Sequence, residues 1–172
     1  MSVTGKHLGM DLLIPEVDHE NRAYFDHLAS GELRLQRCTD DGLLRYPPTS
    51  RCPFCGNADC TWDPVEARGT VYTYTEVHHA IQPAFAEHTP YMVLMVELDT
   101  QRGAPGEHDA LRIMGNLATA DGEMAPPELV AQVGIGSRVR MVTSAAGEGI
   151  AIALWALDED ADQPKAPWRY AE

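Results

Sequence analysis

With 172 residues, the chain is long enough for one domain of ordinary size or for a small module attached to a larger one. Its 13 basic and 26 acidic residues give a formal net charge of -13, which disfavours generic binding to nucleic-acid phosphates. The hydrophobic content of 44% supports a core, yet no apolar run approaches the twenty residues of a membrane span.

The first fifteen residues predict a tail that becomes ordered on contact and ends at Pro15. This N-terminus lacks the basic start and the long apolar core of a signal peptide. We therefore expect a cytoplasmic protein. In a cytoplasmic chain, four clustered cysteines indicate metal binding more than disulfides.

A short helix is predicted from Asp18, because Tyr24, Phe25 and Leu28 recur at helical spacing until Gly31 stops the run. A helix of this length is unstable alone, so its apolar face must pack on another surface. The sequence leaves open whether that surface belongs to the same chain or to another subunit.

The next segment has the pattern of a zinc ribbon. Residues 32–37 alternate apolar and polar side chains, and residues 43–46 form a return strand. Residues 52–56, C-P-F-C-G, are a metal knuckle in which a glycine lets the chain turn tightly around two thiols. Residues 38–42, C-T-D-D-G, have the same spacing, with an aspartate in place of the second cysteine. Such a ribbon has a small core and depends on its metal for folding.

The predicted zinc ligands are Cys38, Asp41, Cys52 and Cys55, because a carboxylate oxygen is an acceptable fourth ligand. A second interpretation replaces Asp41 with Cys60, for which the chain would have to fold back sharply. A third is that the site has lost its metal and the thiols are buried without it. A bound zinc would be structural, because two knuckles normally close its coordination shell.

After residue 64 the composition shifts to strands. The predicted strands cover residues 69–78, 91–98, 111–117, 136–143 and 150–157, with one helical turn at 126–130. Five strands with a helical turn between the third and fourth make a small Greek-key barrel of the OB type. Gly115 indicates a bulge or a close backbone approach, and Met92, Met95 and Met114 are most simply core residues.

The predicted fold is therefore mainly β, with an N-terminal helix, a rubredoxin-like zinc ribbon and a five-stranded OB-fold barrel. We expect four segments: an N-terminal tail with a docking helix, the ribbon, the barrel and an acidic tail. Their bounds are 1–31, 32–64, 65–158 and 159–172.

Three histidines, His78, His79 and His88, lie in or beside the loop that joins the first two barrel strands. Adjacent strand residues point to opposite faces, so His78 and His79 do not both reach one site on a regular strand. A metal or acid–base cluster is thus the weaker interpretation. The loop also contains Phe85, and Tyr91 begins the strand that follows it.

The order of these motifs resembles the family known as domain-of-unknown-function family thirty-five. The resemblance covers roughly Tyr24 to Leu157. The matching sequence segments are G-E-L-R-L-Q-R-C, Y-P-P-T-S-R-C-P-F-C-G, G-T-V-Y-T-Y-T-E-V-H, P-Y-M-V-L-M-V-E-L-D and I-G-S-R-V-R-M. The resemblance implies a rubredoxin-like ribbon joined to an OB-fold, acyl-CoA-associated domain. It also implies a non-catalytic partner of thiolase-like enzymes, including acetyl-CoA acyltransferases and lipid-transfer-type aldolases that cleave steroid side chains. In such assemblies the ribbon and helix bind the thiolase-like subunit, and the barrel lies beside its acyl-CoA channel.

No catalytic motif is present: the chain lacks G-x-S-x-G, a phosphate-cradling glycine loop and any cysteine away from the ribbon. We therefore predict no catalytic residue. The resemblance implies a hetero-oligomer with a thiolase-like or aldolase subunit, with acyl-CoA at the interface. If any part of the chain reaches the substrate channel of that partner, we expect it to be the loop with His78, His79, Phe85, His88 and Tyr91. The alternatives are a single-stranded nucleic-acid binder, which needs basic and aromatic residues on one barrel face, and a free acyl-CoA-binding protein. We expect neither nucleic acid nor membrane as a partner.

Overall fold

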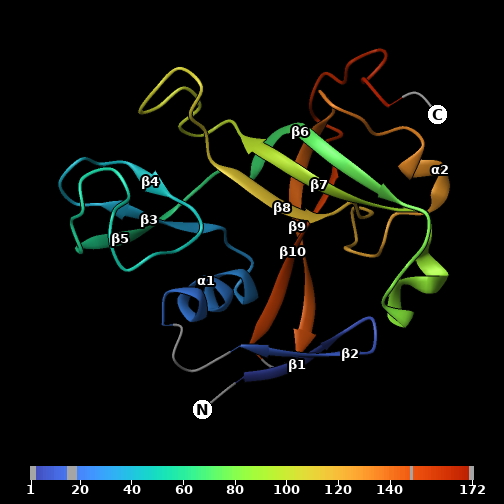
Figure 1. The fold of residues 1–172 in the computed structure, drawn as a ribbon, viewed down its shortest axis with the longest axis horizontal. Coiled ribbons are helices and arrows are strands. Elements are labelled where there is room, and N and C mark those ends of the chain that lie inside the picture. Colours follow the sequence, from blue (N-terminus) through green and yellow to red (C-terminus); the bar gives the residue numbers. More distant parts are fainter. Residues whose placement is uncertain (1–2, 15–18, 148, 171–172) are drawn as a thin grey trace. The chain divides into compact units, whose positions relative to one another are not determined.

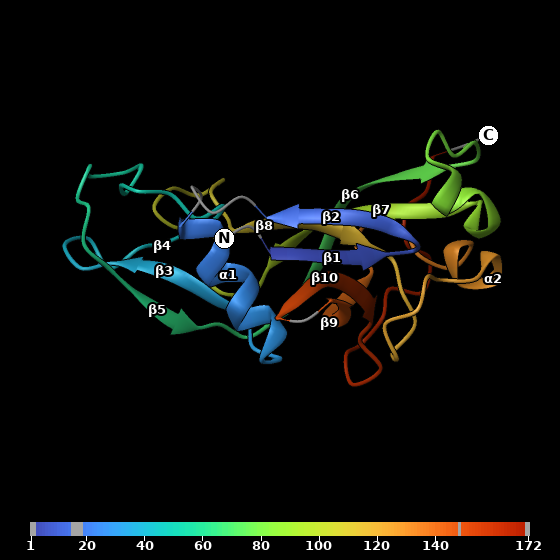
Figure 2. The same cartoon turned by 90° about the horizontal axis from the view of Figure 1, so that it is seen from below.

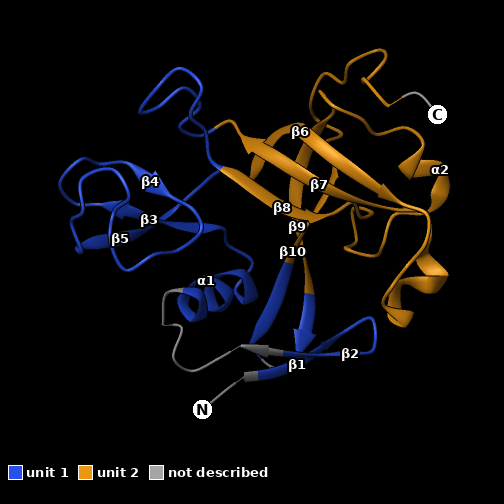
Figure 3. Cartoon of the chain, viewed as in Figure 1, with its two compact units in different colours: residues 1–66, 100–111, 145–152 blue, residues 67–99, 112–144, 153–172 orange. Residues whose placement is uncertain are grey.

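The computed structural model describes residues 3–14, 19–147 and 149–170, and it confirms a mainly β fold. Figure 1 shows its helices and strands. Contacts divide the chain into two compact units, which Figure 3 colours separately. Unit 1 comprises Met1–Glu66, Thr100–Leu111 and Ala145–Ile152, and unit 2 comprises Ala67–Asp99, Arg112–Ser144 and Ala153–Glu172.

Unit 1 begins with a hairpin where we expected a tail. Strands β1 (Val3–His7) and β2 (Met10–Ile14) pair antiparallel, as Figure 2 shows from below. Leu8 and Gly9 both have positive φ, 49° and 80°, which gives the twist that a two-residue hairpin turn requires. Leu12 packs with other apolar side chains of unit 1, so this segment is structured within the chain itself.

Helix α1 (His19–Ala29) ends as predicted, although its expected cap at position 18 lies outside the described residues. The N–H of Glu32 donates to the carbonyl of His27 and that of Gly31 to Leu28, a Schellman motif with Gly31 at φ 82°. The ring centroids of Tyr24 and Tyr46 are 5.7 Å apart. The helix therefore packs on the chain's own ribbon.

The ribbon contains a three-stranded sheet in the order β4–β3–β5. Strand β3 (Arg34–Cys38) and strand β4 (Leu44–Arg45) follow the prediction, whereas β5 (Cys60–Pro64) was not expected. Outside β4, the side-chain amide of Gln101 takes the place of a further strand. Its Oε1 accepts from the N–H of Leu44 at 2.6 Å, and its Nε2 donates to the carbonyl of Leu44 at 2.8 Å.

The five-stranded sheet is the OB-fold barrel, in the order β10–β9–β6–β7–β8. A parallel bridge between Leu117 and Trp155 joins the chain after β8 to β10 and so closes the sheet. Tyr72 lies at the break in register of a bulge on β6. The strands are β6 (Arg68–Val77), β7 (Tyr91–Leu98), β8 (Arg112–Asn116), β9 (Arg138–Gly147) and β10 (Ile150–Leu157).

The barrel core centres on Trp155, which is completely buried. A Cβ atom at Gly115 would lie 3.0 Å from Cδ1 of this indole and 2.8 Å from the carbonyl oxygen of Ala153. The close approach that we expected at Gly115 is therefore present. Between the strands lie a 3-10 helix, η1 (Pro83–His88), and the expected helical turn, α2 (Pro127–Val130).

The C-terminal segment that we expected to be an acidic tail packs on unit 2 as far as residue 170. Ile135 and Trp168 exchange backbone hydrogen bonds of 2.9 and 3.0 Å, and the N–H of Tyr170 donates to the hydroxyl of Tyr74. Arg169 pairs with Glu76. The acidic composition of this segment predicted a solvated tail, but its aromatic and basic residues make the contacts that hold it on unit 2.

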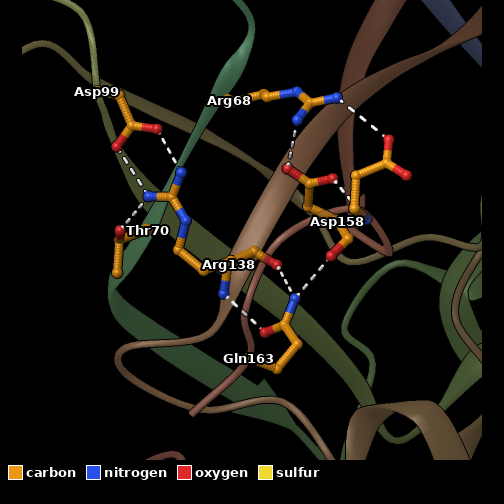
Figure 4. A network of polar contacts seen from close by, with 7 residues as sticks. Arg68, Thr70, Asp99, Arg138, Asp158 and Gln163 are labelled. Atoms are coloured by element: carbon orange, nitrogen blue, oxygen red, sulfur yellow. Dashed lines mark hydrogen bonds and ion pairs between the residues drawn. The ribbon is translucent and has the colours of Figure 1, made fainter.

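A polar network joins the start of the C-terminal segment to β6 and β9 (Figure 4). Arg138 donates to the hydroxyl of Thr70 and pairs with Asp99, while its backbone N–H and carbonyl both bond the side-chain amide of Gln163. Arg68 lies 3.4 Å from the buried carboxylate of Asp158. These arginines are therefore engaged within the protein.

In the part of the chain that the structure describes, no helix is long and apolar enough to cross a membrane.

Candidate metal centre and substrate-channel loop

Two tight turns in unit 1 form the knuckles of the ribbon. The N–H of Gly42 donates to the carbonyl of Cys38 at 3.1 Å, and that of Gly56 donates to Cys52 at 2.9 Å. Both glycines have positive φ, 70° and 80°, a conformation that other residues adopt only with strain. The spacing C-x-x-D-G and C-x-x-C-G thus produces matching turns that bring the candidate ligand atoms close to one another.

The ligand atoms of Cys38, Asp41, Cys52 and Cys55 all lie within 4.8 Å of one another. The sulfurs of Cys38 and Cys55 are 3.5 Å apart, and the Cys52 sulfur lies 3.1 Å from Oδ2 of Asp41. Cys60 is outside this group, although it faces Cys38 across the β3–β5 pair. The arrangement therefore favours Asp41 over Cys60 as the fourth ligand.

Hydrogen bonds keep the Asp41 carboxylate ionised. The backbone N–H of Leu43 donates to Oδ1 at 2.9 Å, and together with the thiols of Cys55 and Cys52 it lowers the pKa of Asp41 to about 2. The N–H of Asn57 lowers the pKa of the Cys55 thiol, but the neighbouring Asp41 carboxylate and partial desolvation outweigh it and raise that pKa to about 12. Metal binding would therefore displace a proton from the Cys55 thiol and none from Asp41.

Three sulfur donors and one carboxylate oxygen suit zinc, which takes four such ligands in a tetrahedron. Each knuckle would contribute two ligands, so the protein would fill the coordination shell and leave no position for water or substrate. The zinc ribbon and its cysteine cluster thus support a structural zinc. We propose Cys38, Asp41, Cys52 and Cys55 as its ligands.

Replacing Asp41 with cysteine is expected to raise zinc affinity about tenfold or more, because thiolate is a softer donor than carboxylate. Competition against a chromogenic chelator at pH 7.5 measures the change. Replacing the neighbouring Asp40, which is outside the group, with cysteine is the matched control and should leave affinity unchanged. Equal affinities for the wild type and the Asp41→Cys variant would contradict the proposed ligand.

The loop predicted to reach a substrate channel lies in unit 2 and presents a mixed surface. The ring centroids of Phe85 and Tyr91 are 5.0 Å apart, with the ring planes tilted by 33°. Nε2 of His78 lies 3.3 Å from Glu76. Ile81, at the start of the loop, is 92% exposed.

The loop histidines do not come together. His78 and His79 are exposed and His88 is half-buried. Among the described residues, the one group of three or more potential ligands within 4.8 Å of one another is the cysteine–aspartate group. The structure therefore does not favour a histidine metal site.

The outer face of β6, β7 and β8 carries exposed apolar side chains that the sequence analysis did not single out. Met114, expected in the core, is 58% exposed, and Tyr72 is 51% exposed. Only Met92 of the three strand methionines is fully buried. Arg112 lies 4.1 Å above the Tyr72 ring and is paired with Glu97, so its charge is compensated. This outer face, defined by Tyr72, Met95, Arg112 and Met114, is apolar and locally neutral.

The fold and the candidate centre define a protein with a zinc ribbon followed by an OB-fold barrel. A family described as "ChsH2, rubredoxin-like zinc ribbon domain" matches residues 25–59, and one described as "ChsH2, C-terminal OB-fold domain" matches residues 62–144. The chain belongs to this ribbon–barrel family, domain-of-unknown-function family thirty-five, as the resemblance in its motifs indicated.

A solved structure described as "Ltp2-ChsH2(DUF35) aldolase" has a TM-score of 0.65 and 27% identity with this chain. The match covers 84% of this chain and 98% of that one.

Two curated relatives are also similar. The "Probable enoyl-CoA hydratase alpha subunit" of Thermomonospora curvata is 43% identical over 86 residues, 49% of this chain and 26% of the relative. The "3-oxo-4,17-pregnadiene-20-carboxyl-CoA hydratase alpha subunit" of Mycobacterium tuberculosis is 29% identical over 130 residues, 75% of this chain and 35% of the relative. The chain thus spans about a third or less of these relatives.

Proposed function

We propose that the chain is a non-catalytic accessory subunit of a thiolase-like acyl-CoA enzyme. We favour an aldolase over an acyltransferase as that enzyme. One observation carries the proposal. This chain matches 98% of the length of a chain that is described as part of an aldolase. The match covers 84% of this chain, which is more than the barrel alone, so it reaches beyond a common barrel fold.

The candidate metal centre supports this assignment. Its four ligands come from the protein, so the zinc would stabilise the ribbon and would not activate water or polarise a carbonyl. The reactive groups are then supplied by the partner. In an aldolase assembly, the partner would cleave its substrate by a retro-aldol step, which releases a short acyl-CoA and a ketone.

The exposed apolar side chains supply a reason for association. Ile81 in the loop after β6, and Tyr72 and Met114 on the outer face, would lose unfavourable contact with water when a partner covers them. We propose that the loop, with His78, His79, Phe85, His88 and Tyr91, flanks the acyl-CoA channel of that partner. Both curated relatives are named for reactions of CoA thioesters, one of them with a steroid-type acyl group, and we propose a substrate of this class.

A nucleic-acid-binding role is less well supported. Such a role needs cationic side chains that are free to contact phosphates. Arg68, Arg112 and Arg138 each pair with a carboxylate of the same unit. The charge of -13 adds a general repulsion of phosphates. Gel-shift titration with a labelled oligonucleotide at low salt distinguishes this role, and a salt-dependent shift would favour it.

Affinity purification of the tagged chain from its native cells is expected to recover a thiolase-like acyl-CoA enzyme in stoichiometric amounts. Expression of that enzyme alone should give insoluble or inactive protein, and co-expression with this chain should restore soluble activity. Ile81→Glu should weaken the complex, because it places a charge on an exposed side chain that the partner would bury. Gln82→Glu adds the same charge at the next exposed position and serves as the control.

Turnover of acyl-CoA by the purified chain without a partner would contradict the accessory role. If Ile81→Glu and Gln82→Glu weaken the complex equally, the accessory role is unaffected, but the proposed contribution of the loop is contradicted. Titration of CoA thioesters against the isolated chain tests the remaining alternative, a free acyl-CoA-binding protein.

A further inference from the structure

Cys60 is the cysteine that the candidate zinc centre does not use, and it lies directly opposite Cys38. Strands β3 and β5 pair antiparallel with Cys38 and Cys60 in register. The N–H of Thr39 donates to the carbonyl of Asp59, which makes Cys38 and Cys60 a non-hydrogen-bonded pair. In such pairs the Cα atoms are about 4.5 Å apart and both side chains point to the same face.

This geometry is compatible with a disulfide, because bridged cysteines have Cα atoms about 4.4–6.8 Å apart. Both thiols are free in the structure. A bond between them would link two neighbouring strands that already pair over five residues, so it would require side-chain rotation and little backbone movement.

The two thiols differ in how they meet an oxidant. Cys60 is half-buried and uncoordinated, whereas Cys38 is buried and belongs to the proposed ligand set. Metal coordination and burial protect a sulfur from direct attack, while an accessible free thiol is oxidised first. Cys60 is therefore the entry point, and Cys38, directly opposite it on β3, is placed to react with it.

We propose that Cys60 is an oxidation site at which a peroxide converts the zinc-bound ribbon into a zinc-free, disulfide-linked form. The Cys60 thiolate attacks one peroxide oxygen, the O–O bond breaks, and Cys60 becomes a sulfenic acid while an alcohol or water leaves. The Cys38 sulfur then attacks the Cys60 sulfur and displaces hydroxide, which takes up a proton as water. The peroxide accepts two electrons, one from each sulfur.

Loss of the Cys38 ligand leaves three donors, Asp41, Cys52 and Cys55, and these would hold zinc more weakly. The site would thus couple the oxidation state of the cell to the metal content of the ribbon. Through the ribbon it would alter binding to the partner. The inference rests on the proposed zinc ligands, and its experiment separates the two.

The experiment treats the purified, zinc-loaded full chain with tert-butyl hydroperoxide and follows zinc release with a chromogenic chelator. Peptides digested without reduction are mapped by mass spectrometry. The wild type is expected to release one zinc per chain and to form a Cys38–Cys60 disulfide, reversed by dithiothreitol. Cys60→Ser should release zinc about tenfold more slowly, because its accessible free thiol is gone.

Asp59→Ala, which keeps all four cysteines and alters an exposed neighbouring side chain, is the control and should behave as the wild type. The inference is overturned if Cys60→Ser loses zinc as fast as the wild type, or if the disulfide links Cys38 with Cys55 or Cys52 with Cys55. A chain that purifies without zinc would contradict the ligand set alone. The disulfide map would still test the cross-strand pair.

Discussion

Replacing Cys52 with serine is expected to leave the purified chain without zinc and to unfold its ribbon. A serine hydroxyl does not ionise near neutral pH, so the second knuckle would retain one thiol in place of two. Zinc binding supplies on the order of 10 kcal/mol to small ribbons of this kind, and the ribbon core is too small to compensate for its loss. The effect on ribbon stability should exceed that of any single apolar truncation.

Metal analysis and amide hydrogen exchange measure this result. Protection should be lost in β3 and β5, whereas β7 in unit 2 should remain protected. Cys60→Ser, examined under reducing conditions, is the matched control: it removes a thiol of the same ribbon that lies outside the ligand group and should keep one zinc per chain. Zinc retention and wild-type protection in the Cys52→Ser variant would refute the proposed centre.

Replacing Trp155 with alanine is expected to lower the free energy of unfolding by about 3–5 kcal/mol, the range for a fully buried aromatic side chain. The indole fills the space above Gly115, and the strand that carries it closes the barrel through the bridge to Leu117. Because natural domains have about 5–15 kcal/mol in total, this loss would remove much of the stability of the barrel.

Phenylalanine at position 155 refines the test. The Nε1 atom of Trp155 is buried without a hydrogen-bond partner, and an unsatisfied donor of this kind costs about 1–3 kcal/mol. Trp155→Phe removes volume and also this cost, so its destabilisation should be much smaller than that of Trp155→Ala. Trp168→Ala, at an exposed indole, should change stability by less than about 1 kcal/mol. Urea unfolding measures all three, and equal effects at positions 155 and 168 would contradict the core assignment.

The barrel could be predicted because its strands have strong local signals. Strands β7 and β10 have the bounds that the apolar runs indicated, Tyr91–Leu98 and Ile150–Leu157. The hairpin of β1 and β2 was missed, because its Leu8–Gly9 turn lacks the Asn–Gly or Asp–Gly signature of such turns. Strand β5 was missed because its sequence, C-T-W-D-P, neither alternates clearly nor continues past a proline.

The candidate site shows the same limit. Knuckle spacing predicted four candidate ligands, and their side chains lie together, because the turns of a knuckle are local. The opposition of Cys60 to Cys38 depends on the register of a strand 22 residues further along the chain, which local patterns do not specify. The exposure of Met114 was also unpredictable, because an apolar side chain on the outer face of a strand has the same sequence signal as one in the core.

The side-chain amide of Gln101 has a consequence for how the ribbon behaves among other chains. An edge strand normally offers free N–H and carbonyl groups, on which a strand from another molecule can pair and start aggregation. At β4 the backbone donor and acceptor of Leu44 are already bonded to Gln101. This edge of the ribbon sheet is therefore closed to strand addition, and a partner could contact the ribbon there only through side-chain surfaces.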